Sequence, residues 1–376
     1  MKKAVCISCT HHYYERIAPV ESALREKGYE ITYLTSDFHH NSKKHYKVEG
    51  LDHCIQIPTK PYQKNISPQR ILSHIRFARD VFKKAAELQP ELLYVEVPPN
   101  SLSRQAAHYK KKHPETKLVL DIFDMWPESF PGHRAKQLLA LPFRVWGQFR
   151  NKGLSKADLV LTECDLFRDK LQPYLKNTPN HTLHLCRSAA TTENAVTLIP
   201  QEAIHLCYLG AINNIIDIPT IAALIGLVQN QRPVVLHIIG DGESREKFVA
   251  AVEETGARVQ FHGKIYDAAQ KQAIFDQCSF GLNIMKDSVF VGLTMKSLDY
   301  FAGGLPIINT IEGDTAQLVT QRGMGVNVQR EALSATADAV AATTPEANWG
   351  MRQATLDTFR ELFSESVFRE KLLKLL

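Results

Sequence analysis

The chain has 376 residues, which is too many for one ordinary hydrophobic core, so we expect two domains. Its hydrophobic content of 44% and charged content of 23% are typical of a soluble globular protein, and no apolar run reaches the roughly 20 residues that span a bilayer. The net charge of +5 is divided unevenly, because residues 1–190 carry +11 and residues 191–376 carry −6. A basic half favours an anionic partner such as anionic lipid or a phosphorylated substrate. We find no nucleic-acid recognition motif and expect no nucleic-acid partner.

The N-terminus and the cysteines indicate a cytoplasmic chain. No signal peptide is visible, because a histidine pair soon ends the short apolar run AVCISC. Seven scattered cysteines fit reduced thiols. Cys6 and Cys9 form a C-x-x-C, but Cys6 lies inside an apolar strand and no second such pair exists. We therefore interpret both as packed thiols rather than a redox or zinc site.

Short apolar segments alternate with amphipathic ones along the first half. The predicted strands are residues 3–9, 29–35, 53–58, 92–97, 117–123 and 158–163. The predicted helices between them include residues 66–90 and 101–113, whose apolar side chains recur every three to four positions. Strands that alternate with helices of this length predict a parallel sheet with helices on both faces.

The same alternation resumes after a polar stretch, residues 187–203. The predicted strands of the second half are residues 204–210, 234–240, 258–263, 279–285, 305–310 and 325–328. We place one domain at residues 1–190, a linker at 191–202 and a second domain at 203–355. Residues 356–376 belong to one final amphipathic helix with no further strand, so this helix must pack on a domain already formed.

Loops after the strands hold the candidate site residues, because ligands of open parallel sheets bind beyond the carboxyl ends of the strands. The first half offers His11, His12, Lys43, Lys44, Asp124 and Glu128, and the second half offers Gly210, Asn213, Gly240, Gly242, His262 and Gly263. His11 and His12 could instead cap a helix or lie on the surface, and Asp124 could cap the segment before Trp126. No G-x-G-x-x-G, P-loop, H-E-x-x-H or D-x-D is present, so we expect neither a dinucleotide nor a metal.

Residues 292–306, GLTMKSLDYFAGGLP, predict a helix that follows a glycine turn. A helix N-terminus offers unpaired N–H groups to an anion, here at Gly292, Leu293 and Thr294, and Lys296 adds a full charge. Asp299 could accept hydrogen bonds from two sugar hydroxyls. An anion site beside a diol site describes a nucleoside diphosphate. The alternative is an amphipathic helix with an internal Lys–Asp pair.

Four segments of the second half resemble the nucleotide-sugar domain of family-4 glycosyltransferases. They are CYLGAI, IIGDGESREKF, VQFHGKI and GLTMKSLDYFAGGLPII. Asp299 stands at the second glutamate of the family's E-x7-E, which binds ribose, and Val291 stands at the first. Gly304-Leu305-Pro306 matches the family's G-x-P. In the first half, TSDFHHNSKKH, KNISPQRILSH and LDIFDMWPESF resemble a subgroup that makes bacterial capsule, exopolysaccharide or O-antigen.

This resemblance implies the α/β fold called GT-B. In it two Rossmann-like domains with parallel sheets face a cleft, and a C-terminal helix packs back across the domains. It implies a retaining, metal-independent transfer of a hexosyl group from a nucleotide-diphosphate sugar, UDP-sugar favoured, with no other cofactor. The acceptor would be a lipid-diphosphate-linked saccharide at the inner face of the cell membrane. A nucleotide-sugar epimerase of the same fold and a non-catalytic partner of another transferase are the alternatives.

The resemblance also distributes roles over the candidate residues. The catalytic residues would be Asp124, Lys296 and His12. The acceptor would bind at His11, His12, Glu128, Lys43 and Lys44. The donor would bind at Gly210, Asn213, Gly240, Gly242, His262, Gly263, Gly292, Leu293, Thr294, Lys296 and Asp299. The chain departs from the family pattern at two further places. Residues 210–214 lack the arginine and lysine with which many members bind the diphosphate, and Phe123-Asp124 stands where many members have a histidine.

Residues 133–156 mix apolar and basic side chains as membrane-interface helices do. The apolar ones are Leu138, Leu139, Leu141, Phe143, Trp146 and Phe149, and the basic ones are Arg134, Lys136, Arg144, Arg150 and Lys152. The alternative is an ordinary helix that covers the sheet.

Overall fold

The computed structural model describes residues 2–130, 137–188 and 202–376. These residues form two compact units. The first consists of Met1–His184 together with Phe368–Leu376, and the second of Leu185–Val367. The predicted linker, residues 191–202, lies almost wholly outside the described residues.

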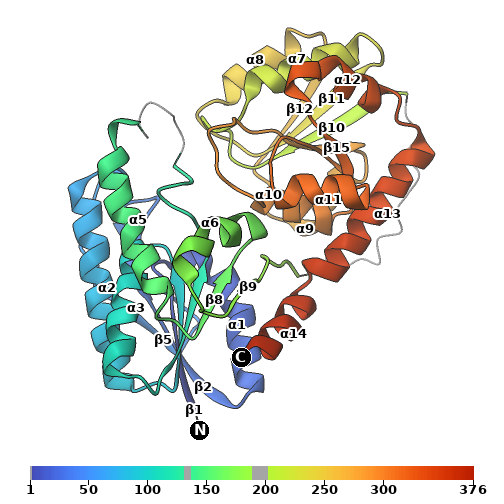
Figure 1. The fold of residues 1–376 in the computed structure, drawn as a ribbon. Coiled ribbons are helices and arrows are strands. Elements are labelled where there is room, and N and C mark those ends of the chain that lie inside the picture. The colour runs from blue at the N-terminus through green and yellow to red at the C-terminus, as the bar shows by residue number, and fades with distance from the viewer. Residues whose placement is uncertain (1, 131–136, 189–201) are drawn as a thin grey trace. The chain divides into compact units, whose positions relative to one another are not determined.

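The described part of the first unit contains a seven-stranded sheet in the order β5-β2-β1-β6-β7-β8-β9 (Figure 1). All neighbouring strands in it are parallel, and every predicted strand of this half is present. The strands are β1 Lys2–Ile7, β2 Tyr29–Ser36, β5 Cys54–Ile57, β6 Leu92–Val97, β7 Lys117–Ile122, β8 Leu159–Thr162 and β9 Asn180–Thr182. A small antiparallel pair, β3 Phe38–His39 with β4 Lys44–His45, and strand β9 were not predicted.

Helices cover both faces of this sheet. In Figure 1, α2, α3 and α5 lie on one side of the strands and α1 and α6 on the other. Their bounds are α1 Tyr14–Glu26, α2 Pro68–Leu88, α3 Asn100–Lys112, α5 Ala140–Leu154 and α6 Asp165–Leu175, with a short 3₁₀ turn, η1 His11–Tyr13, ahead of α1. Helix α2 begins where its sequence predicts, because the Ser67 hydroxyl accepts from the Arg70 N–H and Pro68 occupies the first turn.

The described part of the second unit contains a six-stranded parallel sheet in the order β12-β11-β10-β13-β14-β15. The strands are β10 Ile204–Leu209, β11 Val234–Ile239, β12 Arg258–Gly263, β13 Phe280–Asn283, β14 Ile307–Asn309 and β15 Gly325–Asn327. The helices are α7 Ile218–Gln229, α8 Arg245–Glu253, α9 Ala268–Phe275, α10 Met295–Ala302, α11 Asp314–Arg322, α12 Leu333–Ala341 and α13 Pro345–Leu362, with a 3₁₀ turn, η2 Arg330–Ala332. Apolar residues of α7, α8 and α12 form one core with the strands. The predicted doubly wound α/β architecture is confirmed in both halves.

The prediction of one continuous C-terminal helix was wrong. The chain forms α13 and then α14 Glu365–Leu375, with a break at Phe363 and Ser364. The break arises because the Phe363 carbonyl accepts from the Arg187 N–H at 3.0 Å instead of continuing the helical ladder. The residues from Phe368 onward then belong to the first unit, where Arg369 pairs with Glu26 at 3.6 Å.

Each sheet reverses its strand order next to its first strand. The reversal lies between β1 and β6 in the first unit and between β10 and β13 in the second. Ligands of doubly wound sheets bind at the carboxyl ends of the strands at this point. The loops that follow these four strands are therefore the places to search for binding sites.

Candidate functional site

The first unit has a cavity of about 480 Å³ at its reversal point. Cys9 and Thr10 follow β1, Pro98 and Pro99 follow β6, and Asp124 follows β7; all of them line it. The cavity is completed by the first turns of α2 and by α5. Its remaining lining residues are Tyr13, Ser36, Phe38, His40, Thr59, Tyr62, Asn65, Ile66, Ser67, Pro68, Arg70, Ile71, His74, Phe77, Trp126, Leu139, Pro142, Phe143 and Trp146.

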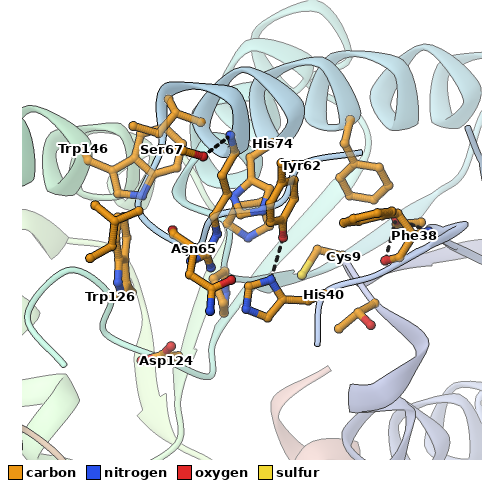
Figure 2. A pocket seen from close by; sticks show the side chains of 18 of the residues that line it. Cys9, Phe38, His40, Tyr62, Asn65, Ser67, His74, Asp124, Trp126 and Trp146 are labelled. Atoms are coloured by element: carbon orange, nitrogen blue, oxygen red, sulfur yellow. Dashed lines mark hydrogen bonds between the residues drawn. The ribbon is translucent and has the colours of Figure 1, made fainter. Parts of the chain in front are cut away.

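Aromatic side chains form much of the wall of this cavity. Figure 2 shows Tyr62 and His74 on one side and Trp126 and Trp146 on another, with Asp124 below Trp126. The Trp126 ring centre lies 5.4 Å from that of Phe143 and 6.2 Å from that of Trp146. Flat apolar rings beside a few polar groups can stack on the faces of sugar rings or enclose an apolar group.

Charged and titratable groups lie in or beside the cavity: Arg70 and His40 line it, whereas Lys43 does not but lies against the ring of Tyr62, which does. The Arg70 guanidinium lies 5.6 Å from the centre of the Trp126 ring, and the Lys43 ammonium lies 4.7 Å from that of Tyr62. His40 Nδ1 is 2.6 Å from the Tyr62 hydroxyl (Figure 2). Burial, and then the positive charges of Arg70 and Lys43, lower the pKa of His40 to about 4. The imidazole is therefore neutral at pH 7 and accepts from or donates to Tyr62 without carrying charge.

Asp124 is the one carboxylate among the described residues that line the cavity. Its Oδ1 accepts from the Ser129 hydroxyl at 2.6 Å, and burial raises its pKa. Cys9 is also in the lining, and burial raises the pKa of its thiol to about 12. The thiol is therefore protonated at neutral pH, as expected for a packed cysteine rather than a redox centre.

The structure separates the other predicted acceptor residues from this cavity. His12 and Lys44 are exposed and do not line it. His11 packs its ring 4.9 Å from that of Tyr14, and its backbone N–H donates to the Tyr46 hydroxyl. His12 therefore lies at the surface, whereas His11 is partly buried and does not cap the helix, since Thr10 does.

Glu128 is held by a buried arginine. Both Arg150 amino groups donate to its carboxylate, at 2.6 and 3.0 Å, and Arg150 is fully buried. The placement of Arg150 and Trp146 among membrane-facing side chains was therefore wrong, because Trp146 is also buried and lines the cavity. Arg134 and Lys136 lie outside the described residues.

Several residues that line the cavity were not predicted from the sequence. They are His40, Tyr62, Arg70, His74 and Trp126. Four of them, His40, Arg70, His74 and Trp126, lie inside segments that already carried the family resemblance, so that resemblance was the available signal. Their proximity depends on how α2 packs on the ends of β1 and β2, which local patterns do not encode.

In the second unit, the start of α10 has the geometry that its sequence predicts. The Thr294 hydroxyl caps the helix by accepting from the Ser297 N–H at 3.1 Å. Lys296 follows in the first turn, and its ammonium lies 4.7 Å from the centre of the Tyr208 ring. Burial lowers its pKa to about 8, and within the described residues no carboxylate pairs with it. A half-buried cation at a helix N-terminus is suited to a phosphate.

Helix α10 is anchored at the reversal point of this sheet. The Tyr300 hydroxyl accepts from the Leu209 N–H at 2.8 Å, at the end of β10. The Tyr208 hydroxyl donates to the Ala211 carbonyl, also at 2.8 Å. The Gly292 carbonyl accepts from the Thr315 hydroxyl, and the Leu293 side chain is buried, so neither residue offers a side chain to a ligand.

Asp299 already has two cationic partners. Its Oδ1 lies 3.3 Å from Arg187 Nε and 3.3 Å from Lys271 Nζ, and its side chain is partly exposed. Asp299 does not pair with Lys296, so the alternative of an internal Lys–Asp pair does not describe this helix. A ribose that binds Asp299 would have to share the carboxylate with Arg187 and Lys271.

The predicted glycines bring two loops into backbone contact. A Cβ on Gly240 would lie 1.9 Å from the Gly210 carbonyl oxygen, and one on Gly242 would lie 2.3 Å from that of Ile212. Gly210 itself has φ +117°, which disfavours any side chain, and open space surrounds its Cβ position. Asn213 closes the first of these loops, because its side-chain oxygen accepts from the Ile215 N–H at 3.1 Å.

A ladder of asparagine side chains crosses the ends of three strands. It was not predicted from the sequence. Asn283 donates to Asn309, and Asn309 donates to Asn327, each at 2.9 Å. Asn283 also accepts from the Thr294 hydroxyl at 3.1 Å, so the ladder fixes the residue that caps α10. The signal was an asparagine at the last position of β13, β14 and β15.

Three histidines form a hydrogen-bonded row on β10, β11 and β12. His205 Nδ1 lies 2.9 Å from His237 Nε2, and His237 Nδ1 lies 3.1 Å from His262 Nε2. Burial, followed by the neighbouring positive charges, lowers the pKa of His237 to about 4. The predicted donor residue His262 thus has its ring against His237, while the backbone of Gly263 accepts from the Gly240 N–H at 2.7 Å.

We expect this histidine row to make the second unit sensitive to acid. The neutral form of His237 is favoured by folding, so its contribution is complete above the unfolded pKa of about 6.5 and is lost as the pH falls toward 4. The melting temperature should fall between pH 7 and pH 5, and His237→Leu should reduce that fall. His181→Leu, at an exposed position, is the control. An equal fall in wild type and His237→Leu would contradict the expectation.

The sequence was compared with family models and with curated proteins. Residues 203–344 match the family model described as glycosyl transferases group 1. No curated protein sequence matches the chain significantly. The part of the chain that the structure describes has no helix both long and apolar enough to cross a membrane.

Solved structures resemble the chain over its whole length. Sucrose-phosphate synthase from Thermosynechococcus elongatus has a TM-score of 0.69 at 15% identity, covering 100% of this chain and 98% of that one. WaaG, a glycosyltransferase involved in lipopolysaccharide biosynthesis, has a TM-score of 0.67 at 13% identity, covering 99% of both chains. Anabaena HepE, solved with UDP and glucose, has a TM-score of 0.65 at 11% identity, covering 100% and 99%. The fold is GT-B, and the domain match supports glycosyl transfer.

Proposed function

We propose that this chain, a GT-B protein with a glycosyl transferases group 1 domain, is a retaining glycosyltransferase. It moves a hexosyl group from a nucleotide-diphosphate sugar to a lipid-diphosphate-linked saccharide. The product would be a unit of a bacterial surface polysaccharide such as capsule, exopolysaccharide or O-antigen. The lipid-linked acceptor would place the enzyme at the cytoplasmic face of the cell membrane.

One observation carries the donor site. Lys296 holds a half-buried ammonium in the first turn of α10, without a carboxylate partner among the described residues. Burying an unpaired charge lowers the stability of the ligand-free protein. An anionic ligand that pairs with the ammonium would offset this loss. The diphosphate of a sugar nucleotide supplies that charge, and Asp299 on the same helix is the candidate ribose ligand. UDP is favoured because the related HepE structure was solved with UDP and glucose.

The reaction requires stabilisation of the leaving diphosphate. The bond between the sugar's anomeric carbon and the diphosphate oxygen breaks, and the acceptor oxygen bonds to the same carbon. Negative charge grows on the leaving oxygen, where Lys296, the α10 N–H groups and the backbone near Gly210 would stabilise it. In a retaining mechanism the leaving phosphate can take the acceptor proton, so neither a separate base nor a metal is required. His12, which was predicted to be catalytic, is exposed and does not line the cavity, so we give it no role in this mechanism.

The acceptor would bind in the cavity of the first unit. Stacking on Trp126 and Tyr62 suits the flat faces of sugar rings, and Asp124 can accept hydrogen bonds from sugar hydroxyls. Arg70 lines this cavity, and Lys43 lies against the Tyr62 ring in its wall, so both supply positive charge that suits the diphosphate of a lipid-linked acceptor. The single carboxylate makes Asp124 the residue that would orient the acceptor hydroxyl.

The same fold is also compatible with a function that does not include glycosyl transfer to an acceptor. The loop from Gly210 to Asn214 offers no cationic side chain, and Val291 replaces a carboxylate that can meet the donor sugar. These features fit an epimerase acting on a sugar nucleotide alone, or a non-catalytic partner of another transferase. Transfer of labelled sugar to an acceptor separates the proposed function from both, and epimer formation without acceptor identifies the epimerase.

The test of the donor site is thermal unfolding with UDP, GDP, ADP and dTDP. We expect UDP to raise the melting temperature, because a ligand at a hundred times its dissociation constant stabilises the folded state by about 2.7 kcal/mol. Screening of UDP-sugars would then identify the donor. If no nucleotide changes the melting temperature of the wild type, the donor site is wrong and the non-catalytic function becomes the better explanation.

A further inference from the structure

Helix α5 and the residue before it expose apolar side chains that do not line the cavity. Leu138 just before the helix, Leu141 and Val145 are 85%, 71% and 53% exposed. The spacing of four residues places Leu141 and Val145 along one stripe of the helix, and Leu138 precedes that stripe in the chain. Residues between them, such as Phe143, line the cavity instead. Isolated exposed leucines are common on soluble proteins, but three large exposed aliphatic side chains so near to one another in the chain mark an interaction surface.

Cationic side chains lie next to this stripe. A groove of about 740 Å³ between α3 and α5 is lined by Arg104, Lys111, Lys152 and Lys156, among others. The Arg104 guanidinium lies 4.5 Å from the centre of the Phe149 ring. We call these four cations and the three exposed apolar residues the α3–α5 surface.

The positive charge of the α3–α5 surface is uncompensated. Among the residues that the structure describes, no aspartate or glutamate lines the groove. One further lining cation, Lys110, is neutralised by Asp158 at 2.8 Å. For the other four, the described residues provide no carboxylate within ion-pair distance. Four unpaired cations on one face create a positive potential that attracts an anionic partner.

We propose that the α3–α5 surface docks on an anionic lipid bilayer. Leu138, Leu141 and Val145 enter the interface, and the cations bind lipid phosphates. A soluble anion would need the cations but not the exposed aliphatic stripe, and the combination of the two is that of interfacial helices. The inference rests on the proposed function in one respect, since a lipid-linked acceptor requires a membrane-bound enzyme. Docking would place the acceptor cavity, whose wall includes other residues of α5, beside the bilayer.

The experiment is flotation of the full chain with vesicles, in the absence of donor and acceptor. Vesicles of phosphatidylcholine alone are compared with vesicles that contain about one third phosphatidylglycerol. Wild type should float only with the anionic vesicles, and added salt should weaken its binding. Leu141→Glu with Val145→Glu removes the apolar contact, and Lys111→Glu with Lys152→Glu removes the charge. The lysine pair should lower the partition coefficient about tenfold or more, because each basic residue near an anionic surface contributes about 1 kcal/mol. The apolar pair should also lower it, because binding strength of an interfacial helix scales with its buried apolar area.

The matched control for the lysine pair is Lys27→Glu with Lys247→Glu, which makes the same change in net charge at exposed positions outside this surface. Controls and wild type should bind alike. Failure of wild type to float with anionic vesicles would overturn the proposal, and so would equal flotation of all variants. If Leu141→Glu instead converts a dimer to a monomer in sedimentation, the surface is a self-interface. Nucleotide-dependent stabilisation is measured on the same variants, so a failed donor site and a failed membrane surface give different results.

Discussion

Lys296→Met should abolish nucleotide-dependent stabilisation and raise the melting temperature of the ligand-free protein. The substitution keeps the length of the side chain but removes the charge that would hold the diphosphate. Loss of one preorganised group of this kind lowers kcat by about 10²–10³-fold. The ligand-free protein gains stability because burial lowers the pKa of Lys296 to about 8, which means that folding disfavours the charged form present at pH 7.

The pH dependence makes this prediction specific. The cost of the buried ammonium is present below the folded pKa of about 8 and disappears as the pH rises toward the unfolded value of 10.5. The stability difference between Lys296→Met and wild type should therefore shrink from pH 8 to pH 10. Lys247→Met, at an exposed position of α8, is the control and should change neither quantity. Unchanged UDP binding in Lys296→Met would remove Lys296 from the donor site.

Arg16→Met should lower the free energy of unfolding by about 3–5 kcal/mol, because it leaves a buried carboxylate uncompensated. Arg16 Nε and Nη2 donate to the two oxygens of Asp121, at 2.9 and 2.8 Å, and both side chains are almost fully buried. The same guanidinium donates to the carbonyls of Leu183 and His184. One arginine thus joins α1, β7 and the segment after β9.

The effect of Arg16→Met should depend on Asp121. In the double variant with Asp121→Asn, no charge is left unpaired, so the loss should be smaller than the sum of the two single losses. Arg79→Met removes an exposed ion pair with Asp80 and should cost less than about 1 kcal/mol. Chemical unfolding of wild type, the two single variants, the double variant and Arg79→Met measures these differences. Additive losses in the double variant would show that the Arg16–Asp121 pair does not contribute through its charges.

Local sequence patterns predicted the strands and the start of α10 well. Buried parallel strands are short apolar runs, and their alternation with amphipathic helices leaves few other architectures. Thr294, Ser297 and Lys296 are close in sequence, so the cap and the charge at the helix N-terminus are properties of one turn. The resemblance of the second half to a known family came from the same kind of local segment.

Residues far apart in the sequence were predicted less well. Cys6 and Cys9 are close in sequence and form a C-x-x-C pattern, yet Cys9 lines a cavity whose wall also includes Tyr62 and Trp126. Arg150 looks like a surface cation in a basic segment, but the fold buries it against Glu128, 22 positions earlier. A local pattern gives the side of a helix on which a residue lies but does not say what will cover that side.

The sequence by itself determined two doubly wound α/β halves and a cationic helix N-terminus at residues 292–296. Both follow from periodicity, capping and charge within short windows, where neighbours in the chain are neighbours in space. Only the tertiary structure decided which residues meet at the acceptor cavity and which cations of α3 and α5 remain unpaired. Those outcomes depend on which helices pack together and on which charges find partners, and contacts over long sequence separations fix both.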